Sequence, residues 1–443
     1  MLPHRRELQT YPTGARRRAL LAVAILALFL TAYEGQLAPI LSLLLADIGM
    51  SLRMYGLITA SSLLVGAISG YVGGRIVDRI GRVRLMVPFL FLSGLSCLFM
   101  ATAESVGQFT VARIVLALVE GIAAAGTAPL VRDYAPRMGR AQAFAFWSWG
   151  RVGANFFAAA VTALTLDLLG GTWQAQLYLM TVISLVGSVV VAATMRDLSP
   201  EVRREIRHSE EAHTRPPVTG PEADGPRPLL RDGTVWMFVA AMSSLFLLLG
   251  TLNAYGQMLV IEALDTSVRS ASAIVMFFWG ANLVASLTAS RWSDRLQLRI
   301  PFLLAGGAGS AAALAALAAL LLMGGRAPTA LVITAFGGLG IALGAVFGPW
   351  MAAFSSYVEE THVDGQGTAF GLEHLVSRLV VLGAVLLAPG IAAAAGWAAW
   401  TVMTLLAVLV FVALTVVLHR RVPERTAPTP SGTSTPGVRD RAS

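Results

Sequence analysis

Charged residues and cysteine are both scarce in this chain. Only 13% of its 443 residues are charged, and every one of the 33 basic residues is an arginine. Ordinary soluble domains carry about 25% charged residues, so the composition excludes that class. The single cysteine, Cys97, leaves no partner for an intramolecular bridge, so no disulfide framework holds the fold.

The sequence also lacks the residue patterns that enzymes use. Apart from His374, the histidines fall in predicted tails and loops, so they form no metal-ligand array. No Ser/His/Asp set, phosphate-binding glycine loop or nucleotide-binding motif stands at a catalytic position. We therefore expect no enzyme, no metal and no cofactor, and an ion gradient as the source of energy.

Hydrophobic residues, by contrast, make up 56% of the chain and gather in runs long enough to cross a bilayer. There are six such runs in each half, so the sequence predicts an all-α membrane protein with twelve transmembrane helices. The runs are 19–46, 54–77, 84–103, 106–131, 141–168 and 173–195, then 235–261, 270–292, 300–323, 328–357, 367–395 and 397–418.

The arginines predict the orientation of these helices. Alternate loops and both tails are rich in arginine, whereas the other loops hold only Arg53, Arg269 and Arg326. Arginine-rich loops stay in the cytoplasm, so both termini are expected there. The net charge of +8 is explained in the same way and does not indicate nucleic-acid binding.

The predicted helices divide the chain into five parts. A cytoplasmic tail (1–18) precedes a six-helix bundle (19–195). A proline-rich cytoplasmic linker (196–233) leads to a second six-helix bundle (234–419), and a disordered cytoplasmic tail (420–443) follows.

Glycines recur at every fourth position in two of the runs. Such spacing places small residues on one helix face and allows close helix packing, which we favour over a substrate role. The residues are Gly66, Gly70 and Gly74, and Gly340, Gly344 and Gly348.

A short basic turn separates the second and third runs and is the predicted gating segment. Gly74 is expected to let a neighbouring helix approach closely, and Gly81 to supply the free φ of a tight reversal. Asp78 is expected to dock on another helix N-terminus near residues 365–368. Arg79 and Arg82 complete the turn.

A weaker copy of this turn, 290–299, lies about half a chain later and again places an acid before an arginine, as Asp294 and Arg295. The first copy resembles the loop between helices two and three of the major facilitator superfamily, Gly-x-x-x-Asp-Arg/Lys-x-Gly-Arg followed by basic residues. Val83 departs from that pattern. The resemblance implies two pseudo-symmetric six-helix bundles that transport a solute by alternating access.

Six charged residues stand at membrane depth, where each costs about 2.5–3.5 kcal/mol on insertion scales. They are Glu34, Arg113, Glu120, Arg151, Glu373 and Arg378.

Four of these residues are predicted to couple transport to protons. Glu34 matches an acid that serves coupling or substrate binding in many superfamily members. Arg113 and Glu120 lie seven residues apart on one helix face, in a stretch that resembles the superfamily's helix-four motif. Glu373 is the fourth. The alternative is structural: Glu34 hydrogen-bonds its neighbours, and Arg113 and Glu120 form a permanent pair.

The remaining arginines predict an anionic or zwitterionic ligand. Arg151 has Trp147 and Asn155 one turn to each side, and Arg378 lies one turn after His374. Each half thus supplies an arginine at a similar depth, and two guanidinium groups suit a carboxylate, sulfonate or phosphate. Neutralisation by the nearby glutamates is the alternative. The predicted substrate-binding residues are Tyr33, Gln36, Trp147, Arg151, Asn155, Asn253, Tyr255, His374 and Arg378.

Three functions remain open from the sequence. The first is a proton-coupled permease for an organic anion or polar metabolite. The second is a proton-driven exporter of drugs or secondary metabolites, and the third is a non-transporting receptor on a transporter scaffold. In each case we expect a monomer in the lipid bilayer of a bacterial cytoplasmic membrane.

Overall fold

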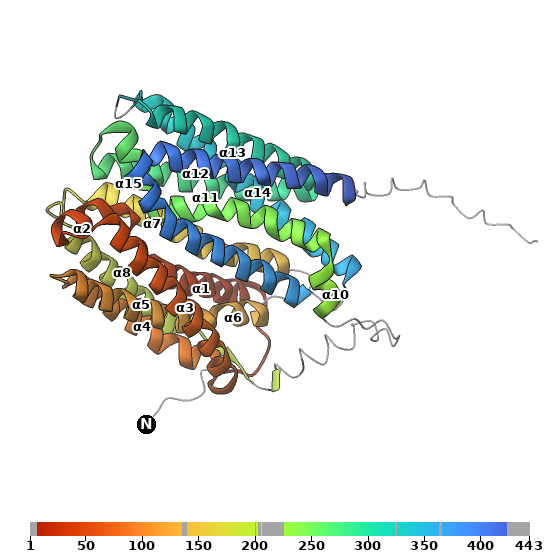
Figure 1. The fold of residues 1–443 in the computed structure, drawn as a ribbon. Coiled ribbons are helices and arrows are strands. Elements are labelled where there is room, and N and C mark those ends of the chain that lie inside the picture. Colours follow the sequence, from red (N-terminus) through yellow and green to blue (C-terminus); the bar gives the residue numbers. More distant parts are fainter. Residues whose placement is uncertain are drawn as a thin grey trace, which may run out of the picture.

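The computed structural model describes residues 7–134, 140–199, 201–202, 205, 226–323, 326–362 and 366–422. Long helices dominate these residues (Figure 1). The first half holds α1 (Gly14–Tyr33), η1 (Ala38–Ile40), α2 (Leu41–Ile48), α3 (Leu52–Ile80), α4 (Arg82–Ala101), α5 (Val106–Ala125), α6 (Thr127–Tyr134), α7 (Arg140–Thr165) and α8 (Trp173–Thr194). The second half holds α10 (Pro226–Arg231), α11 (Gly233–Leu264), α12 (Val268–Leu296), α13 (Ile300–Leu321), α14 (Thr329–Thr361) and α15 (Gln366–Arg421).

The described residues contain ten helical segments long and apolar enough to cross a membrane. The 26-residue helix α7 has the length of a further span, and its polar Arg151 and Asn155 lower its hydropathy. The long α15 is two helices joined at Gly396, whose φ of 77° breaks the helix. Adding α7 and counting α15 as two gives the twelve helices that the sequence predicts.

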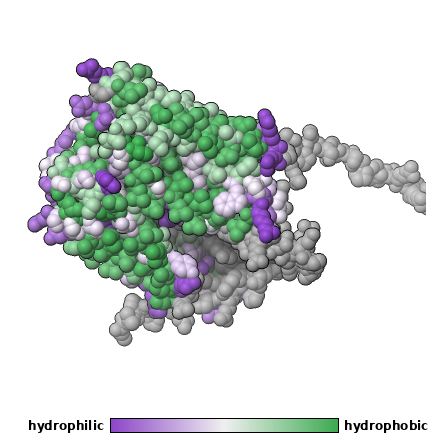
Figure 2. Space-filling view, viewed as in Figure 1, coloured by the Kyte–Doolittle hydropathy of each residue, from purple (hydrophilic) through white to green (hydrophobic). Residues whose placement is uncertain are grey.

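The helices form two bundles that follow the two halves of the sequence (Figure 1). In the first, α3 packs on α5, α4 on α8 and α1 on α7; in the second, α11 packs on α15 and α12 on α14. A broad hydrophobic band covers the molecule, and hydrophilic side chains gather towards its two ends (Figure 2). A hydrophobic surface of this kind suits a helix bundle in a bilayer, where the backbone N–H and C=O groups must form their hydrogen bonds within the protein.

Side chains of polar residues begin several of these helices. Ser51, Ser105 and Ser267 each accept a hydrogen bond from the backbone N–H three residues later. Thr172 begins α8 in the same way, and Asp232 begins α11 by accepting from Thr234. Such caps satisfy N–H groups that a helix leaves without partners at its first turn.

The first span is not the single helix that the sequence predicts. α1 ends at Tyr33, the chain unwinds at Glu34, Gly35, Gln36 and Leu37, and helix resumes at η1 and α2. The break occurs because Pro39 cannot donate a helical hydrogen bond. The turn is held instead by the N–H of Gln36, which donates to the Tyr33 carbonyl at 3.0 Å.

Contacts between the two bundles lie away from the termini. Asn253 of α11 donates to Asn155 of α7 at 3.0 Å, and Arg269 of α12 forms an ion pair with Asp167 at 2.6 Å. Gly56 of α3 faces α15, where its missing side chain leaves room for the Val385 carbonyl. These contacts therefore join the two bundles on the side away from the predicted cytoplasm.

Asp232 ties α11 to α14 at the predicted cytoplasmic end of the second bundle. It accepts hydrogen bonds from the Tyr357 hydroxyl at 2.8 Å and pairs with His362 at 2.9 Å. Burial raises the pKa of Asp232, but the hydrogen bonds from His362, Tyr357 and the backbone outweigh it, so the pKa lies below its ordinary value.

The glycine spacing predicts close packing correctly at most of its positions. A Cβ on Gly70 would lie 3.4 Å from the Gly121 carbonyl oxygen, and one on Gly344 would lie 2.4 Å from that of Asn282. Gly74 has nothing within 4 Å of that position, so the close approach predicted there is wrong for this conformation.

Gly340→Ala should destabilise the protein because its new Cβ would lie 2.4 Å from the Phe278 carbonyl oxygen. We expect a loss of about 1–3 kcal/mol, the usual cost of overpacking, seen as a lower Tm of the purified protein. Gly338→Ala is the matched control on the same helix, because nothing lies within 4 Å of its Cβ position. Equal Tm values for the two variants would contradict the packing.

Candidate functional site

The gating turn reverses at Gly81, as predicted from the sequence. Its φ of 102° is one that only glycine adopts easily, and it separates α3 from α4. The backbones of Asp78 and Arg79 belong to α3, but their side chains lie outside the described residues, as does residue 365. The predicted docking of Asp78 therefore stays a prediction.

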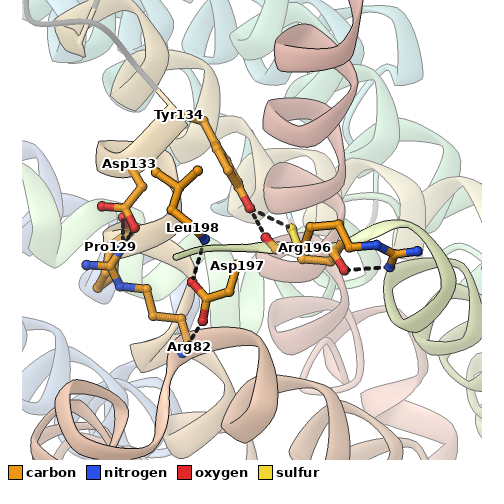
Figure 3. Close-up of polar contacts among 8 residues, drawn as sticks. Arg82, Pro129, Asp133, Tyr134, Arg196, Asp197 and Leu198 are labelled. Atoms are coloured by element: carbon orange, nitrogen blue, oxygen red, sulfur yellow. Dashed lines mark hydrogen bonds and ion pairs between the residues drawn. The ribbon is translucent and has the colours of Figure 1, made fainter. Parts of the chain in front are cut away.

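Arg82 holds the start of α4 to its own bundle (Figure 3). Its guanidinium pairs with Asp133 of α6 and donates to the Pro129 carbonyl at 3.1 Å. Its backbone N–H donates to Asp197 at 3.0 Å, which caps α4. Arg82 thus fixes the turn on the N-terminal bundle.

Asp197 belongs to a short parallel strand pair that the sequence does not predict. The strand β1 (Glu7–Leu8) pairs in parallel with β2 (Asp197–Leu198), which follows α8. Leu8 and Leu198 are buried, and the Tyr11 hydroxyl donates to the Tyr134 carbonyl at 3.1 Å. The N-terminal segment is therefore fastened across the end of the first bundle, next to Arg82.

The second, degenerate turn is arranged differently. Asp294 pairs with Arg299 at 2.5 Å, and Arg299 also donates to Ser293 at 2.9 Å. The side chain of Arg295 is exposed. This copy therefore stabilises its own loop.

The break in α1 brings three of the predicted coupling residues together. Arg113 donates from Nη2 to the Gly35 carbonyl at 3.2 Å, and the same carbonyl accepts from the Leu37 N–H at 3.1 Å. A Cβ on Gly35 would lie 3.3 Å from Nη1 of Arg113 and 3.4 Å from Oε1 of Glu120. Glu34 is fully buried next to this point, and neither of its carboxylate oxygens has a hydrogen-bond partner among the described residues.

Glu373 is placed apart from that cluster. Ser377 donates to its carboxylate at 2.8 Å, and Ser377 also contacts Ser243 of α11 at 3.1 Å. Glu373 thus lies between two helices of the C-terminal bundle.

Arg151 and Arg378 come from opposite bundles and lie close enough to interact electrostatically. Arg151 also interacts with Glu120, and its side chain reaches solvent-accessible space deep in the protein. Neither arginine has a described carboxylate within 4.0 Å, since no ion pair joins them to one. Arg378 donates from Nε to Nε2 of His374 at 2.8 Å, so His374 accepts as a neutral ring.

Asn155 and Asn253 lie beside this pair. Asn155 donates to the Arg151 carbonyl at 3.3 Å and accepts from Asn253 across the bundles. They therefore close the space around Arg151 on the side away from the termini.

The other predicted binding residues contact other parts of the protein instead of the two arginines. Tyr33 is buried and stacks on Phe29, with ring centroids 5.4 Å apart. Gln36 donates to the Ala32 carbonyl, Tyr255 donates to the Val385 carbonyl, and Trp147 donates to Thr127. Their polar groups are thus engaged with the protein in this conformation.

No group of three or more His, Cys, Asp or Glu residues that could hold a metal ion occurs among the described residues. The site therefore consists of arginines, carboxylates and amides that both helix bundles contribute. This arrangement is typical of a secondary transporter, in which a solute site is shared by two bundles that move against each other.

The sequence profile of the Major Facilitator Superfamily matches residues 20–372. The chain belongs to this family, and it is a multi-pass membrane transporter rather than an enzyme.

Solved structures share this fold. The D-xylose–proton symporter aligns with a TM-score of 0.67 at 16% identity, over 92% of this chain and 98% of that one. A bacterial homologue of the human lysosomal transporter Spinster, inward-facing and unoccupied, gives 0.69 at 14% identity, over 94% and 100%.

Two curated relatives match only in part. The multi-drug resistance efflux pump PmrA of Streptococcus pneumoniae is 32% identical over 130 residues, which is 28% of this chain and 33% of the pump. A probable hexose phosphate transport protein of Chlamydia trachomatis is 21% identical over 270 residues, 57% of this chain and 59% of that protein. The chain thus matches less than two thirds of either relative's length.

Proposed function

We propose that this transporter carries a small organic anion across a bacterial cytoplasmic membrane and is driven by protons. The observation that carries the substrate class is the pair Arg151 and Arg378. Two like charges that interact without a described carboxylate within 4.0 Å of either are unfavourable in a low-dielectric interior. An anion bound between them would relieve that repulsion and accept two-donor hydrogen bonds from each.

Phosphate esters are the anions that we favour within this class. Guanidinium groups bind phosphate in a planar, two-donor geometry, and His374 keeps one of the two guanidinium groups oriented. The partial match to a probable hexose phosphate transport protein supports the same chemistry.

The coupling proposal rests on Glu34 and Glu120. Both carboxylates adjoin the break in α1, and Glu120 interacts with Arg113 and with Arg151 of the solute site. A proton on Glu120 would change the charge that Arg151 experiences. Proton binding and anion binding are thereby linked in one cluster.

Export of drugs or secondary metabolites is the second candidate. It is supported by the match to an efflux pump and by the aromatic group of Phe29, Tyr33 and Phe157, whose rings lie within 5.5 Å of each other. Such a group suits a large apolar solute. Binding of a lipophilic cation in place of an anion would favour it, and the absence of flux for every solute would favour a receptor.

Removing either arginine should weaken anion binding. In Arg151→Ala and Arg378→Ala we expect the affinity for a hexose phosphate to fall roughly tenfold to a hundredfold, as for loss of charged hydrogen bonds worth about 1.5–3 kcal/mol. The measurement is titration calorimetry on purified protein. Lysine at either position should rescue poorly, since a point charge cannot replace the planar guanidinium.

Arg326→Ala is the matched control, because it removes the same charge from an exposed loop. It should bind as the wild type does. A folded Arg151→Ala protein with unchanged affinity for hexose phosphate, inorganic phosphate and a dicarboxylate would exclude the two-arginine site.

Glu34→Gln should separate coupling from solute movement. The amide keeps the shape of the side chain but cannot carry a proton, so uptake driven by a pH gradient into proteoliposomes should stop while solute exchange continues. Preserved pH-driven uptake would show that Glu34 does not couple, and would shift the proposal to Glu120.

A further inference from the structure

A buried polar cluster lies beside the break in α1, around the Glu34 carboxylate. The side chains of Ser93 on α4 and Ser184 on α8 face the Glu34 carboxylate, and all three residues are fully buried. Within the described part of the chain, neither carboxylate oxygen of Glu34 meets the geometric limits of a hydrogen bond, and neither does the Ser184 hydroxyl. Buried polar atoms without partners are rare in folded proteins, so this group calls for a ligand.

The surroundings of Glu34 favour a positively charged ligand. Among the described residues, the charged group that acts on Glu34 is Glu120, which repels it. Arg113 does not neutralise Glu34, because its guanidinium turns to the Gly35 carbonyl. Glu34 also stands at the C-terminal end of α1, where the helix dipole is negative. An ionised Glu34 therefore lacks any counter-charge that the protein supplies.

The donor atoms indicate which cation fits. Carboxylate and hydroxyl oxygens bind hard cations, whereas transition metals prefer imidazole and thiolate. Unwound segments and C-terminal ends of broken helices coordinate sodium in other transporters. We propose that Glu34, Ser93 and Ser184 form a sodium-binding site between α1, α4 and α8.

Gly35 adjoins both this site and the side chains of Arg113 and Glu120. A Cβ at Gly35 would lie 3.3 Å from Nη1 of Arg113 and 3.4 Å from Oε1 of Glu120, so these two side chains pack against it. Glu120 also interacts electrostatically with Glu34. Its negative charge therefore favours a cation at Glu34 further.

In the proposed transport cycle the sodium ion would bind at Glu34 in place of the proton. A role for sodium in transport rests on the proposed function, whereas sodium binding to the protein does not. Binding is therefore tested on the purified full-length protein without any solute, and a negative result leaves anion transport and proton coupling untouched.

The experiment is thermal unfolding of the protein in lipid nanodiscs, with sodium chloride replacing choline chloride at constant ionic strength and one fixed pH. Wild-type Tm should rise with sodium and saturate, since a ligand that binds only the folded state stabilises it. The rise should vanish in Glu34→Gln. In Ser184→Ala, which keeps the carboxylate, the sodium concentration for half the rise should increase about tenfold.

Ser62→Ala is the matched control, because it removes a buried hydroxyl on α3 that bonds only its own helix. It should keep the wild-type sodium response. Identical Tm values in sodium and choline for the wild type would overturn the site. So would a sodium response that persists unchanged in both Glu34→Gln and Ser184→Ala.

Discussion

The cost of holding charge inside a membrane governs the arrangement of this transporter. A charged side chain at that depth needs a partner, a water-filled space or a ligand. Arg113 finds a partner in the Gly35 carbonyl, at the point where α1 unwinds. Arg151 opens instead onto a solvent-accessible space. Glu34 is buried and has no hydrogen-bond partner among the described residues, and we place the coupling ion there.

The cost of burying charge also links solute binding to the movement of the two bundles. Arg151 belongs to α7 and Arg378 to α15, so their distance changes when one bundle rocks against the other. Their mutual repulsion opposes approach, and the anion that we propose as the solute would remove it. Contacts such as Asn155–Asn253 and Arg269–Asp167 close the side away from the termini and must break for the opposite opening. Arg82 and β1 meanwhile keep the gating turn attached to its own bundle.

Hydropathy was sufficient to predict the twelve helices, because bilayer spans need long apolar runs whatever their packing. Half-chain symmetry predicted one arginine from each bundle at a similar depth, and Arg151 and Arg378 do interact electrostatically between the bundles. The break at Glu34 was missed, although Pro39 is a signal for it, because the run is otherwise apolar. Pairing of Glu7–Leu8 with Asp197–Leu198 was missed because two-residue strands show no periodicity. Ser93 and Ser184 were missed because single serines are common in membrane helices, so only their position beside Glu34 distinguishes them.

We propose that the site between the bundles opens to the cytoplasm and holds an anion between Arg151 and Arg378. Labelling of Asn253→Cys tests this arrangement, because Asn253 is exposed beside Arg151 and one further change, Cys97→Ala, removes the native cysteine. A membrane-impermeant thiol reagent should label this variant in inside-out vesicles, and hexose phosphate should slow the labelling while the neutral hexose does not. Labelling from the outer side alone, or equal rates with both solutes, would contradict the account.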